Sequence, residues 1–249
     1  MTIVFTAMRS HVIVTACDSA IREEVGGDAA YSRGKKSFVL EGIGVVTAWG
    51  AREGNSISRF MQDLRDHGKL RQVDQLADDV DRYLQTEYSP HERGADDTGF
   101  DVTGFLDGVP RFYGLSWHAA RKEGFPGTYG RVVSSPGPGM YMNYSGREDL
   151  AEALVQALTK QESLGQAPPF SLKSPRGLLT LAHLVLRFAR ELTFDVGPPY
   201  VANVISPGNH IHTIHLPEWQ PLSDPALMQL VDELRRMEDR WPRSSGQPA

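Results

Sequence analysis

Residues 3–17 read IVFTAMRSHVIVTAC and carry the strongest strand pattern near the start of the chain. It holds two short runs of apolar and β-branched residues, 3–7 and 12–17, which are separated by the polar break Arg9-Ser10. Runs of this length and composition predict two paired strands that are buried on both faces. The chain therefore begins inside a sheet.

Further strands are predicted where short apolar runs are bounded by turn residues, and Asp107-Gly108 is a strong hairpin signal among these turns. The runs are 37–40, 45–48, 100–105, 111–115, 200–205 and 210–216. Residues 21–33 are polar and Gly-rich, and no strand is expected there. Residues 118–139 are rich in Gly, Pro and Ser, which predicts an irregular insertion.

Helices are predicted where apolar residues recur at helical spacing. One pair is expected around 56–86. A second pair covers 148–160 and 174–192, where Ser174 can cap the first turn. The tail 223–249 also carries apolar residues at helical spacing, so a C-terminal helix and tail are expected.

The order of these blocks indicates an α+β fold with helices packed on sheets. Clean βαβ alternation, a GxGxxG motif and a P-loop are all absent, which disfavours a doubly wound nucleotide-binding fold. No second core composition begins after the insertion at 118–139. A single domain over 1–249 is therefore expected.

Composition excludes several classes of function. The chain is 40% hydrophobic, and no apolar run reaches membrane-spanning length, so no membrane is expected as a partner. A net charge of −5 without long runs of Lys or Arg disfavours nucleic acid as a partner. Cys17 is the only cysteine, and residues 1–10 lack the pattern of a signal peptide. A cytoplasmic location is expected.

Several short motifs follow one another in an order that points to one family. They are Thr2-Ile3-Val4, Ala16-Cys17-Asp18-Ser19, Gly34-Lys35-Lys36-Ser37-Phe38, Thr47-Ala48-Trp49-Gly50, the segment 104–113 and Asn143-Tyr144-Ser145-Gly146. Each motif alone is weak. In this order and at this spacing the sequence resembles the proteasome β-subunit family and its bacterial relatives of the HslV type, which are N-terminal-nucleophile hydrolases.

The resemblance implies a fold, an activity and partners. The implied fold is a four-layer αββα sandwich, with two sheets between helical layers. The implied activity is that of a threonine-type peptidase that cleaves peptides or unfolded protein. Subunits of this kind assemble into closed rings, and an ATPase that unfolds substrates is a further implied partner. No cofactor and no metal are implied.

The motifs also imply roles for individual residues. Thr2, exposed by removal of Met1, would be the nucleophile, and its own α-amine would accept the proton because a threonine hydroxyl is a poor nucleophile at neutral pH. The backbone N–H of Gly50 would face the tetrahedral oxyanion. Ser145 would support the nucleophile by hydrogen bonding.

Lys36 and Asp18 are expected to form a pair. In the family pattern, Lys36 supplies positive charge beside the hydroxyl and the amine, and Asp18 holds the lysine in its charged state. Lys36 also shares strand parity with Phe38 and Leu40, so a buried face would require a partner for its charge. Lys35 is the second choice because it lies on the opposite face.

The chain departs from the family pattern in places. An Asp followed three residues later by Ser is not reproduced around Asp195, so no catalytic role is assigned to it. Trp49 stands where the family has a small residue, and Tyr144 stands where it has a glycine. Both substitutions would narrow the cleft.

Two other functions stay open. The same Thr2 chemistry applied to a small molecule would make the chain an amidohydrolase, and the insertion at 118–139 is compatible with this. A non-catalytic structural subunit of the same fold would retain Met1.

Other residue patterns favour structural roles. His210, His212 and His215 are spaced in a way that invites a metal site, but only the first two share a strand face, and no Cys or carboxylate cluster accompanies them. We therefore expect these histidines to lie on the surface of a strand and not to bind a metal ion. Cys17 is expected to act as a small apolar residue of a buried strand and not as a nucleophile.

Overall fold

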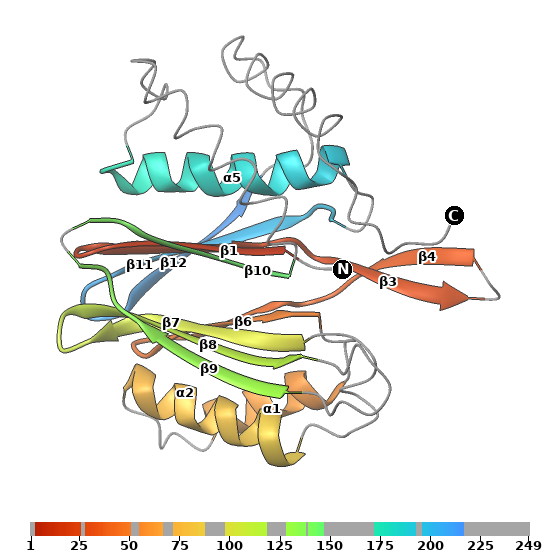
Figure 1. The fold of residues 1–249 in the computed structure, drawn as a ribbon, viewed down its shortest axis with the longest axis horizontal. Helices are drawn as coiled ribbons and strands as arrows, with labels where there is room; N and C mark the ends of the chain where they lie inside the picture. Colours follow the sequence, from red (N-terminus) through yellow and green to blue (C-terminus); the bar gives the residue numbers. More distant parts are fainter. Residues whose placement is uncertain are drawn as a thin grey trace, which may run out of the picture.

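The computed structural model describes residues 3–25, 28–50, 55–66, 72–87, 98–118, 128–137, 139–146, 172–192 and 196–216. Within these ranges most of the chain forms two antiparallel sheets of five strands each, which are stacked face to face (Figure 1).

The first sheet contains both strands of the opening segment. Its strands are β1 (Ile3–Arg9), β2 (Val12–Cys17), β10 (Tyr141–Gly146), β11 (Tyr200–Ser206) and β12 (His210–Leu216). Their spatial order is β10-β1-β2-β11-β12. Every residue of β2 is buried, which confirms the prediction of strands covered on both faces.

The second sheet has the order β5-β6-β7-β8-β9. Its strands are β5 (Ser37–Leu40), β6 (Gly44–Trp49), β7 (Thr98–Leu106), β8 (Val109–His118) and β9 (Thr128–Ser134). Asp107 and Gly108 connect β7 to β8 with φ angles of 51° and 76°. Positive φ at both central residues is the geometry of a type I′ hairpin turn, so the predicted hairpin is confirmed.

Two segments without a predicted strand contain strands. Residues 20–33 include the antiparallel pair β3 (Ala20–Val25) and β4 (Asp28–Arg33), which projects from the body of the molecule (Figure 1). The segment 118–139, expected to be irregular, contains β9. β9 lies at the edge of its sheet, where one side of the strand makes no ladder, and its sequence therefore shows only a weak strand pattern.

The helices pack on the outer faces of the sheets. α1 (Asn55–Asp66) and α2 (Val73–Arg82) lie on the second sheet, and α2 continues as the π-helical turn η1 (Tyr83–Glu87). α5 (Pro175–Leu192) crosses the first sheet. None of the described helices combines the length and apolar character needed to cross a membrane.

α5 begins as the sequence predicts. The Ser174 hydroxyl accepts a hydrogen bond from the backbone N–H of Gly177 at 3.0 Å, which caps the helix.

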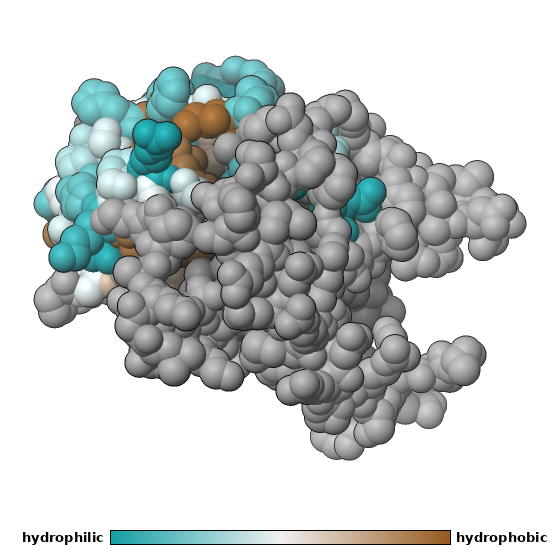
Figure 2. Space-filling view, turned by 90° about the horizontal axis from the view of Figure 1, so that it is seen from above, coloured by the Kyte–Doolittle hydropathy of each residue, from teal (hydrophilic) through white to brown (hydrophobic). Residues whose placement is uncertain are grey.

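Seen from the α5 side, hydrophobic residues lie at the surface among hydrophilic ones (Figure 2). The predicted helices at 148–160 and 223–249 lie outside the described residues.

The expected α+β, four-layer αββα sandwich is wrong for the part of the chain that the structure describes. That part is rich in β-structure: two five-stranded sheets and a strand pair, with only α1, α2 and α5 as α-helices. The expectation counted too little strand, because it took 21–33 and 118–139 as irregular although these segments contain β3, β4 and β9. Strand pairing there depends on neighbouring strands, which a local pattern does not reveal.

A transverse row of polar residues runs across the inner face of the first sheet. Its members are directly paired across all five strands, in the order Asn143, Thr6, Thr15, Asn203 and Thr213. Asn203 donates to Ser37 of the second sheet at 2.8 Å and accepts from Thr213 at 2.8 Å. These hydrogen bonds offset the desolvation of the buried polar groups.

An apolar cluster fills the space between the sheets on one side of this row. Met8, Ile13 and Ile205 of the first sheet pack there against Phe105 and Phe112 of the second. The opposite side of the row leads to the beginning of β1 and the end of β2. The polar candidate residues gather at that end.

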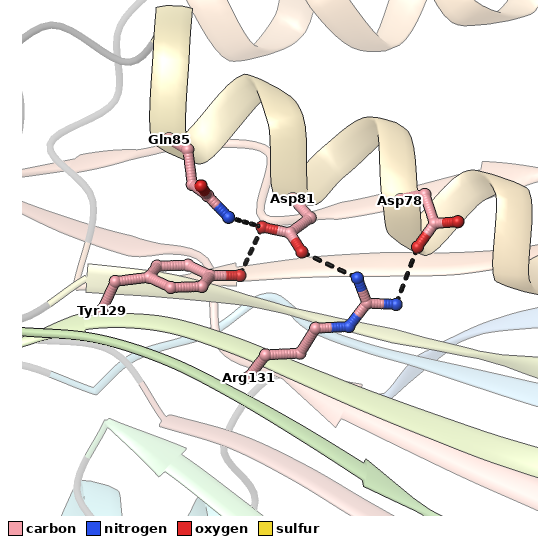
Figure 3. A network of polar contacts seen from close by, with 5 residues as sticks. All are labelled: Asp78, Asp81, Gln85, Tyr129 and Arg131. Carbon is pink, nitrogen blue, oxygen red and sulfur yellow. Dashed lines mark hydrogen bonds and ion pairs between the residues drawn. The ribbon is translucent and has the colours of Figure 1, made fainter.

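A polar network ties the edge strand β9 to α2 (Figure 3). Asp81 accepts hydrogen bonds from the Tyr129 hydroxyl and the Gln85 amide, and it accepts from Arg131 at 2.7 Å. Arg131 also contacts Asp78 at 2.7 Å. Burial and the hydrogen bond to Asp81 raise the pKa of Tyr129. Asp81 is thus the point at which the helix holds the strand.

We expect Asp81→Asn to lower the free energy of unfolding by about 1–3 kcal/mol, because it removes the charge opposite Arg131 at a largely buried position. Asp79→Asn is the matched control on the same helix. Asp79 forms an ion pair with the exposed Arg82 at 2.7 Å, so the control should stay within about 0.5 kcal/mol. Urea unfolding measures both variants, and equal effects would contradict a special role for Asp81.

Candidate active site

Several strand termini from both sheets meet at one end of the sandwich. Val4 of β1 is paired with Ser145 of β10 on one side and with Cys17 of β2 on the other. Trp49, the last residue of β6 in the second sheet, packs against Val4 and Cys17. The motif residues around 16–19, 36, 49 and 145, which are far apart in sequence, therefore belong to one end of the molecule.

Asp18 and Lys36 form a buried ion pair at this end. The Lys36 Nζ lies 3.1 Å from both Asp18 carboxylate oxygens, and the two side chains are 8% and 0% exposed. The backbone N–H of Ile3 also donates to Asp18 Oδ1 at 3.2 Å. One carboxylate thus binds the lysine of the second sheet and the backbone at the start of β1.

Lys36 reaches Asp18 for a reason other than strand parity. Phe38 packs in the cluster beneath α1 and α2, on the outer face of the second sheet, whereas Lys36 contacts the first sheet. Lys36 precedes β5, so strand alternation does not fix its direction. Its carbonyl accepts from the Ala48 N–H at 2.8 Å, which holds it beside the end of β6.

Lys35 is in a different environment. It is exposed, and its Nζ lies 5.3 Å from the centre of the Phe38 ring. Partial desolvation and the nearby Arg65 lower the pKa of Lys35. The neighbouring lysines thus occupy separate sites, and Lys36 is the one that contacts Asp18.

Thr2, the predicted nucleophile, lies outside the described residues, as does Met1. The first described residue, Ile3, is joined to Thr2 by a peptide bond, and its N–H is the group bound by Asp18. The first described residue of the chain therefore lies next to the Asp18–Lys36 ion pair.

Gly50 follows β6 with a φ of 66°, a conformation that favours glycine. The Trp49 carbonyl before it accepts from the Thr98 hydroxyl at 3.1 Å. A Cβ on Gly99 would lie 2.5 Å from the Trp49 ring and would clash with it, so the indole can pack there only because residue 99 is glycine. Trp49 therefore packs between the sheets.

Ser145 is held by a residue that the sequence analysis missed. Its hydroxyl lies 2.8 Å from Asp101 Oδ2 and 3.0 Å from Asp101 Oδ1. The Asn143 amide donates to the Ser145 oxygen at 3.0 Å. Asp101 is 1% exposed in the middle of β7. The sequence did offer a signal for Asp101: an acidic residue within an apolar strand is expected to be buried, and a buried carboxylate requires hydrogen-bond donors.

The remaining predicted residues are placed as follows. Tyr144 stacks on Phe5 with ring centres 6.5 Å apart, on the α5 face of the first sheet and away from the inner face. Asp195 lies outside the described residues. Ser19 binds the carbonyl of Pro199 at 2.7 Å, so the segment before β11 lies against the end of β2.

Cys17 is buried, and burial together with the neighbouring Asp18 raises the pKa of its thiol to about 12. A thiol of this kind stays protonated at neutral pH and is a poor nucleophile.

The histidines of β12 lie on an exposed edge strand. His210 and His212 share one face, and His215 lies on the other. Within the described ranges no group of three or more His, Cys, Asp or Glu side chains is placed to hold a metal ion.

The fold is similar to that of Anbu proteins of known structure. Anbu (ancestral beta-subunit) from Yersinia bercovieri matches with a TM-score of 0.57 at 12% identity, over 99% of this chain and 100% of that chain. The Gly-1 mutant of Anbu from Hyphomicrobium sp. strain MC1 gives 0.55 at 13%, over 99% and 100%. The helical assembly of the Anbu complex from Pseudomonas aeruginosa gives 0.53 at 15%, over 99% and 98%. Similarity at this level shows the fold alone.

No model of a known protein family matches the sequence, and no curated protein matches it. The assignment to the proteasome β-subunit and HslV-type family is therefore wrong as stated, and the supported relation is a structural similarity to Anbu proteins. Most of the motifs behind it are three to five residues long, and they lie mainly at strand ends and turns. Such short segments carry too little information to identify a family.

The ion pair can be tested by stability measurements on Asp18→Asn, Lys36→Met and the double variant. Each single change leaves the other charge buried without its partner, which should cost about 3–5 kcal/mol. Asp18→Asn keeps an oxygen acceptor for the Ile3 N–H. The double variant should therefore cost less than the sum of the single changes by about 1–3 kcal/mol in denaturant unfolding. Additive costs would contradict direct coupling of the two charges.

Proposed function

We propose that the chain is a threonine-type peptidase in which Thr2 is the nucleophile once Met1 has been removed. The observation that carries this proposal is the hydrogen bond between the Ile3 N–H and Asp18, whose carboxylate also binds Lys36. Ile3 N is two bonds from the Thr2 Cα. The α-amine and the hydroxyl of Thr2 are therefore tied by the chain to the neighbourhood of a buried ammonium group.

The proposed reaction follows from this arrangement. The Thr2 hydroxyl gives its proton to its own free α-amine as its oxygen bonds to the carbonyl carbon of the substrate. The C–N bond then breaks, and the protonated amine returns the proton to the leaving nitrogen. Water, deprotonated by the same amine, hydrolyses the ester and releases the acid and free Thr2.

Lys36 and Gly50 have supporting roles in the proposal. The positive charge of Lys36 favours the unprotonated amine and the developing alkoxide of Thr2. Asp18 keeps that charge in place at 3.1 Å from the ammonium nitrogen. The backbone N–H of Gly50, at the end of β6 beside Lys36, is the proposed donor to the oxyanion; one such donor stabilises the transition state by roughly 2.7–4 kcal/mol.

The nucleophile is tested by comparing Thr2→Ala, Lys36→Met and Lys35→Met, each produced so that the mature chain starts at residue 2. Thr2→Ala should lower turnover of a fluorogenic peptide by about a thousandfold or more, because the nucleophile is lost. Lys36→Met should lower kcat by about a hundredfold, whereas Lys35→Met, the adjacent exposed control, should stay within about twofold.

Covalent labelling separates the alternatives. A peptide β-lactone should acylate wild-type protein at Thr2, located by tandem mass spectrometry, and should leave Thr2→Ala unlabelled. Labelling at Thr2 without turnover of any peptide in a library would favour an amidohydrolase of small molecules. Active protein that uniformly retains Met1 would overturn the mechanism.

Self-association is the second part of the proposal. A peptidase free in solution would attack its neighbours unless its sites face an enclosed space, and closed assemblies of repeated heterologous contacts provide one. The Pseudomonas aeruginosa neighbour is described as a helical assembly, which supports association of this fold into larger particles.

Sedimentation velocity at low micromolar concentrations should show one large species whose mass is independent of concentration, as expected for a closed ring. A mass that grows with concentration would indicate an open helix. A stable monomer that still hydrolyses peptides would contradict compartmentalisation and leave Thr2 as the nucleophile.

A further inference from the structure

Asp101 is a buried acid beside the proposed site. It lies in the middle of β7, is 1% exposed, and is on the inner face of the second sheet, since it pairs with Thr47 and contacts Ser145 of the first sheet. Burying a carboxylate costs much free energy unless it accepts hydrogen bonds. Its presence in the interior requires a reason beyond packing.

The hydrogen bonds around Ser145 have a defined direction. The Asn143 amide donates to the Ser145 oxygen at 3.0 Å, so this oxygen acts as an acceptor. The Ser145 hydroxyl has one proton, and the Asp101 carboxylate, 2.8 Å away, is an acceptor for it. Because its proton is committed to Asp101, the Ser145 oxygen can only accept any further hydrogen bond.

Ser145 is also close in register to the start of β1. It pairs with Val4, and Gly146 pairs with Ile3. On the other side of β1, Asp18 binds the Ile3 N–H. The first described residues of β1 are therefore flanked by Asp18 at the end of β2 and by Ser145 near the end of β10.

We infer that Asp101 is a positioning residue for the proposed reaction: through Ser145 it fixes an oxygen that accepts an N–H of the Thr2 α-amine. The lone pair of that amine is then left for the proton of the Thr2 hydroxyl. A Ser145 hydroxyl free to rotate would instead donate to the amine and occupy the lone pair that the reaction needs. This inference rests on the proposed function and adds a residue to it.

The charge of Asp101 has a second effect that can be measured separately, on the pKa of the Thr2 α-amine. A negative charge near the α-amine favours its protonated form, so removing that charge lowers the pKa of the amine. Among the described residues, the other titratable groups at this end are Asp18, Lys36 and Cys17, and all of them remain in an Asp101 variant. Tyr141 packs against the apolar cluster on the other side of the polar row and is also within reach of the Asp101 charge. Burial, with a smaller contribution from Asp101, raises the pKa of Tyr141.

The test compares Asp101→Asn, Ser145→Ala and the double variant with Thr103→Val, in mature protein. Thr103 is buried on the same strand and the same inner face as Asp101 and controls for loss of a polar group there. The measurements are kcat and KM for a fluorogenic peptide. In addition, trace labelling with acetic anhydride across a pH series, read by mass spectrometry of the N-terminal peptide, gives the titration of the Thr2 amine directly.

We expect Asp101→Asn to lower kcat by about 10-fold to 100-fold with KM within about twofold, and to move the titration of the Thr2 amine to lower pH. The double variant should be little worse than Ser145→Ala, and Thr103→Val should match wild type. An unchanged amine titration in Asp101→Asn, or multiplicative losses in the double variant, would overturn the inference.

Ser145→Ala carries the test if Asp101→Asn does not fold, because it removes the acceptor while leaving the charge in place. It should lower kcat by a similar factor with little shift in the amine titration, and full activity in this variant would overturn the inference. Failure of the β-lactone to label wild-type Thr2 would overturn both the proposed function and this inference. If the β-lactone labels wild-type Thr2 but Asp101→Asn keeps the wild-type kcat and amine titration, only this inference is overturned.

Discussion

The carboxylate of Asp18 is the group on which the rest of this structure depends. It is fully buried and binds the Lys36 ammonium at 3.1 Å and the Ile3 N–H at 3.2 Å. These contacts join the end of β2, the approach to β5 and the start of β1, and so they link the two sheets where the chain begins. A lysine in that position would be strongly unfavourable without the carboxylate, because an unpaired buried charge loses its hydration without compensation.

The interior between the sheets is crossed by a polar row, with an apolar cluster on one side of it and the Asp18–Lys36 ion pair on the other. Met8, Ile13 and Phe112 belong to the apolar cluster, whereas the row from Asn143 to Thr213 is entirely polar. A sandwich built for stability alone would continue the apolar packing, since each polar group must find a partner to offset its desolvation. The polar row therefore has a role in fixing strand register, because a slip by one residue would move its members to the α5 face.

Local signals in the sequence specified the turns and caps. Asp107-Gly108 forms the β7–β8 turn, and Ser174 caps α5, because positive φ angles and N-terminal N–H groups are requirements of a few adjacent residues. The strand β9 was not predicted. Its position depends on pairing with β8 and on Tyr129 and Arg131 binding Asp81 of α2, 48–50 residues away in sequence, and such contacts leave no local pattern.

From the sequence alone, Thr2, Asp18, Lys36, Gly50 and Ser145 could be nominated as candidate site residues, and Asp18 could be predicted as the partner of Lys36. The packing of the two sheets was needed to show that Lys36 meets Asp18, that Lys35 lies over Phe38 instead, and that Asp101 holds Ser145. Asp101 and Ser145 are 44 residues apart and belong to different sheets. A hydrogen bond acts over about 3 Å, so it exists only after the sheets have stacked, and no spacing along the chain encodes it.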